Sequence, residues 1–167
     1  MRRSTLAIAA LILLLAAPAW AQRGAGFHGW GPRVGVTIDP DQVHGGVHFD
    51  MGDLARRLML LPNAEIGFGD NLTVLTAMFE VDYRFRDTWG SWNPYVGGGL
   101  GPVFYWYDGG GDNTEFGLTV QGGIAKQLGS QPGFMFLEMK VGLADSPDVK
   151  FSIGWNFGSG GGGSSGG

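Results

Sequence analysis

Two histidines on one face of a strand-like segment are the first candidates for chemistry. His44 and His48 lie on the polar phase of the stretch 42–50, which alternates between apolar and polar residues. Imidazole is a common metal ligand. Four residues of extended chain, however, separate the two rings by about 13 Å, too far for one ion to bind both. We therefore predict no metal site, and interpret the pair as hydrogen-bonded histidines of a polar interior.

Acidic residues at the same kind of position could act as a general acid and base. Glu80, Asp82 and Glu138 lie on the polar phase of their segments, and so do four bases. A buried charge without a partner is very costly. We therefore predict internal ion pairing in place of acid–base catalysis. The expected polar network consists of Arg33, Asp50, Glu65, Glu80, Asp82, Arg84, Glu138, Lys140 and Lys150.

A serine and a histidine could together form a lipid-modifying enzyme. Ser152 and His48 share the polar phase, and they come close if the first and last segments pair. No feature of the sequence supplies an oxyanion hole, and the glycine-rich runs lack the G-K-[ST] of a phosphate loop. We therefore predict no catalytic residue and no cofactor, with a lipid-modifying enzyme kept as an alternative.

The segment that must position these groups is clearest at the end of the chain. From Val149 to Phe157, large apolar residues alternate with Lys150, Ser152, Gly154 and Asn156. This period of two predicts a strand with one apolar and one polar face.

The same pattern recurs seven times upstream, over 32–39, 42–50, 58–68, 72–85, 94–107, 114–127 and 134–143. The strands have about the 9–11 residues that cross a membrane. Their short connections favour antiparallel, up-and-down neighbours. We read 51–57, which has some helical character, as a connection. The prediction is an all-β protein with one eight-stranded barrel over 32–157.

Alternation alone does not say which face of the barrel meets water. A soluble lipocalin-like periplasmic barrel that binds an apolar ligand would be apolar inside, whereas a membrane barrel is apolar outside. Only 16 % of the residues are charged, below the usual quarter, and aromatic residues gather near strand ends. These features favour the membrane barrel, with an aromatic girdle of Trp30, Tyr83, Phe85, Trp89, Trp92, Trp106, Trp155 and Phe157. An eight-stranded interior is filled by side chains, which leaves at most a narrow pore as a further alternative.

The two ends of the chain carry targeting and linker patterns. Residues 1–21 have a basic start, an apolar core and an Ala-Trp-Ala site, typical of a cleaved signal peptide. We expect a periplasmic lead-in at 22–31 and a flexible Gly/Ser tail at 158–167.

The chain has no cysteine, so no disulfide can stabilise it. The signal holds two of the 11 basic residues and none of the 15 acidic ones, leaving a net charge of −6 that argues against a nucleic-acid partner.

Three stretches resemble the small outer-membrane β-barrel family of Gram-negative bacteria, the OmpA-like and OmpX-like barrels. They are E-I-G-F-G-D-N at 65–71, Y-V-G-G-G-L-G at 95–101 and the final strand ending at Phe157. The family usually ends on that phenylalanine, whereas ten residues follow it here. The resemblance implies an eight-stranded transmembrane β-barrel in the outer membrane, porin-like in architecture. It also implies a monomer that contacts outer-membrane lipid, with Val149–Phe157 recognised by the barrel-assembly machinery.

Overall fold

The computed structural model describes residues 26–129 and 133–158. The expected signal peptide, most of the lead-in before Gly26 and all of the tail beyond Gly158 lie outside these ranges. The described residues contain no helix long and apolar enough to cross a membrane.

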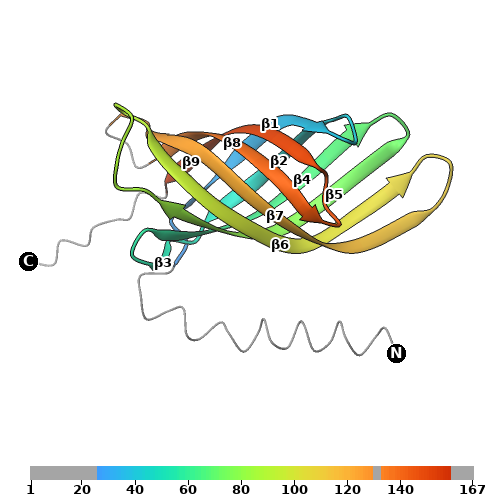
Figure 1. Ribbon diagram of the computed structural model, residues 1–167, viewed down its shortest axis with the longest axis horizontal. Coiled ribbons are helices and arrows are strands. Elements are labelled where there is room, and N and C mark those ends of the chain that lie inside the picture. Colours follow the sequence, from blue (N-terminus) through green and yellow to red (C-terminus); the bar gives the residue numbers. More distant parts are fainter. Residues whose placement is uncertain (1–25, 130–132, 159–167) are drawn as a thin grey trace, which may run out of the picture.

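The fold is a closed barrel of eight antiparallel strands with one short additional strand (Figure 1). The strands are β1 (Gly29–Ile38), β2 (Gln42–Asp50), β3 (Asp53–Ala55), β4 (Leu58–Gly69), β5 (Leu72–Arg84), β6 (Asn93–Tyr107), β7 (Asp112–Gln127), β8 (Gly133–Ala144) and β9 (Val149–Gly158). Neighbours in the sequence pair around the barrel, except that β2 pairs directly with β4. The first and last strands close it, with Val34 opposite Ile153 and Gly29 opposite Gly158.

Two local predictions differ from the structure. β1 begins at Gly29, three residues before the expected boundary, because Gly29 and Trp30 still pair with both Asp50–Phe49 and Gly158–Phe157. The expected connection at 51–57 contains β3, which pairs with the start of β4 in a short irregular ladder. A three-residue strand is too short to show a period of two in the sequence.

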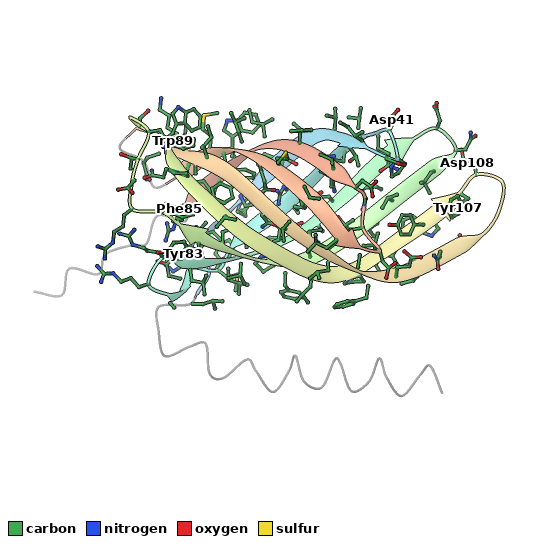
Figure 2. All side chains as sticks on the ribbon, viewed as in Figure 1. Asp41, Tyr83, Phe85, Trp89, Tyr107 and Asp108 are labelled. Carbon is green, nitrogen blue, oxygen red and sulfur yellow. The ribbon has the colours of Figure 1, made fainter. Side chains whose placement is uncertain are left out.

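The alternation of the strands sets the two faces of the wall. Val34, Leu137 and Phe151 remain 47, 41 and 44 % exposed on the outer face, whereas Arg33, Glu80 and Lys140 are 2, 1 and 3 % exposed inside. Figure 2 shows side chains projecting from the whole outer surface. This distribution is the reverse of that of a water-soluble barrel.

Two glycines of β6 make room for the acidic side chains of β5. A Cβ atom at Gly97 would lie 1.9 Å from Oδ1 of Asp82, and one at Gly99 would lie 2.8 Å from Cγ of Glu80. The glycine-rich run that the sequence shows at 97–99 thus provides the space in which β5 buries its carboxylates.

The two ends of the barrel differ in composition. The terminal end, where β1 begins and β9 ends, carries Tyr83, Phe85 and Trp89, and the opposite turn end carries Asp41, Tyr107 and Asp108 (Figure 2). Trp30 and Phe157 meet edge to face at the terminal end with ring centroids 6.3 Å apart. Phe104 and Trp106 stack near the turn end. These aromatic residues thus lie near the two ends of the barrel.

Candidate functional site

Arg33 is the centre of a charged layer that crosses the lumen. Its guanidinium contacts three carboxylates from three other strands: Nη1 donates to Glu80 on β5 at 3.2 Å, and Nη2 donates to Glu138 on β8. Nε lies 3.0 Å from Oε1 of Glu65 on β4, an ion pair whose angle departs from hydrogen-bond geometry. One side chain of the first strand thereby connects β1 to the opposite wall.

Two lysines complete the layer. Lys140 on β8 donates to Glu80, and its Nζ lies 3.6 Å from Glu65 and 3.8 Å from Glu138. Lys150 on β9 donates to the second oxygen of Glu65. The three bases and three acids of this layer balance in charge. Each of their side chains is at most 7 % exposed, so the pairing offsets desolvation that would otherwise be very costly.

Neutral donors extend the layer toward the terminal end. Tyr95 donates through its hydroxyl to Glu138 at 2.9 Å, and Gln121 donates to Asp82 at 2.8 Å. Asn156 donates to Asp50 at 3.2 Å. Asp50 and Asp82 therefore lie inside as predicted, with amide partners in place of the basic partners that the sequence suggested. Tyr95 is 8 % exposed inside the lumen.

Arg84 corrects the predicted network. It lies at the end of β5 and pairs with Asp53 of β3, with both side chains more than 40 % exposed. Its inward phase is right, but its height along the barrel places it at the open mouth, beyond the charged layer. Asp53, which lies in the predicted connection, was not expected to face it.

The histidine beside Ser152 is His44, not the predicted His48. Nε2 of His44 lies 3.0 Å from Oγ of Ser152, and Nδ1 lies 3.0 Å from Oγ1 of Thr37. The order hydroxyl–imidazole–hydroxyl resembles a nucleophile with an oriented base. All three side chains are buried on the inner face, and none lines the small chamber or the terminal mouth, although Ser152 is among the residues that line a separate depression. The arrangement is a chain of two hydrogen bonds that joins Thr37, His44 and Ser152 across three strands.

His48 lies on the other side of Arg33 and has a different environment. It is 1 % exposed, packs edge to face on Phe136 at 5.2 Å, and neither ring nitrogen has a hydrogen-bond partner among the described residues. The guanidinium of Arg33 lies 5.2 Å from the centroid of the same Phe136 ring. His48 lines a small enclosed chamber of about 20 Å³ next to the charged layer, the room of about one water molecule.

No group of three or more potential metal ligands occurs within 26–129 and 133–158. The site residues that sequence reasoning missed are neutral: Thr37, Tyr95, Gln121 and Asn156. Each lies on the inward phase of its strand, so the alternation pattern could have identified it. They were missed because the predicted network included only charged residues.

Comparison of the sequence with protein-family models and with curated proteins finds no match. Solved structures do match. The crystal structure of Neisserial surface protein A aligns with a TM-score of 0.65 at 14 % identity, covering 81 % of this chain and 99 % of that one. The N-terminal β-barrel domain of Pseudomonas aeruginosa OprF aligns with a TM-score of 0.63 at 13 % identity, covering 82 % of this chain and all of that one. At such identities the likeness concerns architecture, and this chain has the closed eight-stranded fold of those small barrels.

Proposed function

We propose that this chain is an integral outer-membrane barrel of a Gram-negative bacterium, with a closed lumen and a structural role in the cell envelope. The observation that carries the proposal is the inversion of the barrel: apolar side chains cover the outside and six paired charges fill the inside. Water would solvate that exterior poorly, whereas lipid matches it. The shared fold of the two solved barrels supports the same location.

The proposed orientation follows from the ends of the strands. With the signal peptide removed at Ala21, both chain ends leave the barrel at the terminal end, which then faces the periplasm. The tight turns near Asp41, Asp70, Asp108 and Asp145 then face outward. In this arrangement Val149–Phe157 is the closing strand presented to the assembly machinery, and the barrel works as a monomer without a nucleic-acid partner.

The first test is the solvent in which the chain folds. We expect the chain from Gln22 onward to refold into a heat-modifiable barrel, seen as a gel shift, when diluted from urea into lipid vesicles or detergent micelles. Dilution into buffer alone should give aggregate, because the outer face has no water-soluble partner. A monomeric β-structure in plain buffer would restore the soluble, ligand-binding alternative.

The second test concerns the lumen. Because ion pairs, Tyr95 and Phe136 fill the cross-section around Arg33, we expect the barrel in planar bilayers to show no steady open conductance. A double variant that removes both long bases, Arg33→Ala with Lys140→Ala, should conduct if it inserts. Sustained wild-type conductance equal to that of the double variant would favour the narrow pore over the closed structural barrel.

A further inference from the structure

A depression lined by basic residues lies at the terminal end of the lumen. The closed structural barrel proposed above gives it no role. It has a volume of about 280 Å³ and lies between the β3–β4 turn, β5, the start of β6, β7 and β8. Its lining residues are Arg57, Met59, Arg84, Phe85, Asn93, Ala125, Lys126, Gln127 and Phe134. Three bases and no carboxylate line it, in a protein whose turn end is acidic.

Two of the three bases of this mouth are available for a ligand. Arg84 has Asp53 as its partner, but Arg57 and Lys126 form no ion pair with any residue that the structure describes. The backbone N–H of Arg84 donates to the carbonyl of Arg57 at 2.9 Å, which holds the two arginines side by side. Lys126 lies with Nζ 5.7 Å from the centroid of the Trp92 ring. Two guanidinium forks and an ammonium suit a phosphate or a carboxylate.

The lining of the depression also has apolar residues. They are Met59, which is buried, Phe85, Ala125 and Phe134. Met59, Arg84, Ala125 and Phe134 also line the enclosed chamber deeper in the lumen, so the two spaces adjoin. His48, with both ring nitrogens unpartnered among the described residues, lines that deeper chamber.

We propose that this mouth is a binding site for a small amphipathic anion, a phosphate or carboxylate on a short apolar or aromatic stem. The anionic group lies against Arg57, Arg84 and Lys126, and the stem lies on Met59 and Phe134. The deeper chamber holds about 20 Å³, too little for the stem, so the ligand remains at the mouth. The proposal concerns the mouth itself and does not depend on which compartment it faces.

Phenyl phosphate is the probe for this site, titrated by calorimetry into the refolded barrel in an uncharged maltoside detergent. We expect saturable one-to-one binding, and weaker binding of inorganic phosphate, which lacks the stem. Arg57→Gln with Lys126→Gln should weaken phenyl phosphate binding by about tenfold or more, since two charge-assisted contacts are lost. Neither side chain forms an ion pair with a described residue, so the substitutions break no salt bridge, although Lys126→Gln removes the contact with the Trp92 ring.

The matched control is Arg56→Gln with Arg86→Gln, which removes the same charge from exposed positions of the same rim outside the depression. It should change binding by less than about twofold. Absence of saturable binding at millimolar phenyl phosphate, or an equal loss in both double variants, overturns the site. Phosphatidylglycerol added to the micelles identifies the source of the anion: displacement of the probe indicates a lipid headgroup, and no displacement indicates a soluble ligand.

Discussion

Replacing Arg33 by Met is expected to lower the free energy of unfolding of the barrel in lipid by about 3–5 kcal/mol, the usual cost of removing one partner from a buried ion pair. Three carboxylates lose their shared partner, and Lys140 and Lys150 alone then face Glu65, Glu80 and Glu138. Methionine retains most of the aliphatic stem of arginine. The measured loss of stability therefore reflects the removed charge more than the removed side-chain volume. Urea titration of the gel shift in lipid vesicles measures it.

Two further variants make this result specific. Arg84→Met removes an arginine from the exposed pair with Asp53 and should cost no more than about 1 kcal/mol. Adding Glu138→Gln to Arg33→Met removes one stranded charge and should recover part of the loss. If Arg33→Met and Arg84→Met destabilised the barrel equally, the lumen would have no central ion-pair layer.

Leu137→Lys is expected to destabilise the barrel in lipid by about 2–4 kcal/mol, the cost of a lysine at the bilayer midplane. Leu137 is 41 % exposed on the outer face and lies opposite Ile153, midway along the closing strand. The same urea titration in vesicles of fixed composition measures the loss, and the strand partners of residue 137 are the apolar Ile124 and Ile153.

Val149→Lys is the matched control, because Val149 begins β9 and pairs with Ile38 at the end of β1. A lysine there reaches the interface and should cost about 0–1 kcal/mol. A Leu137→Lys variant as stable as Val149→Lys would mean that the middle of the outer face does not meet hydrocarbon.

The faces of the wall could be predicted from the sequence because a strand allows only two phases. Alternation placed Arg33, Glu65 and Lys140 on one face, the low charge content and the aromatic strand ends identified that face as the interior, and the three residues are buried there. The position of a residue along the barrel axis was harder to predict, because it depends on how each strand is staggered against its neighbours. Arg84 has the predicted inward phase, but it lies nearer the end of the barrel than predicted, where it pairs with Asp53.

Ion pairing across the lumen could be predicted, but the sequence does not fix which individual side chains meet. The pairing of Ser152 with His44 instead of His48 depends on the register between β1, β2 and β9, in which Gly35 lies opposite both His44 and Ser152. A one-residue slip would reverse every face, but the sequence pattern is unchanged by a slip of two. Only the closed structure fixes which of the two histidines meets the hydroxyl.

The shared position of Arg33 has a consequence for the order in which the barrel assembles. Its three acidic partners come from β4, β5 and β8, and the neighbouring Lys150 comes from the last strand, whereas Arg33 belongs to the first. A sheet that has not yet joined β1 to β9 therefore carries unneutralised charge along its concave side, and that side must stay hydrated until the seam closes. Closing the seam between β1 and β9 brings Arg33 and Lys150 to their acidic partners together, so if the barrel inserts into lipid as proposed, the water inside leaves only when the seam closes.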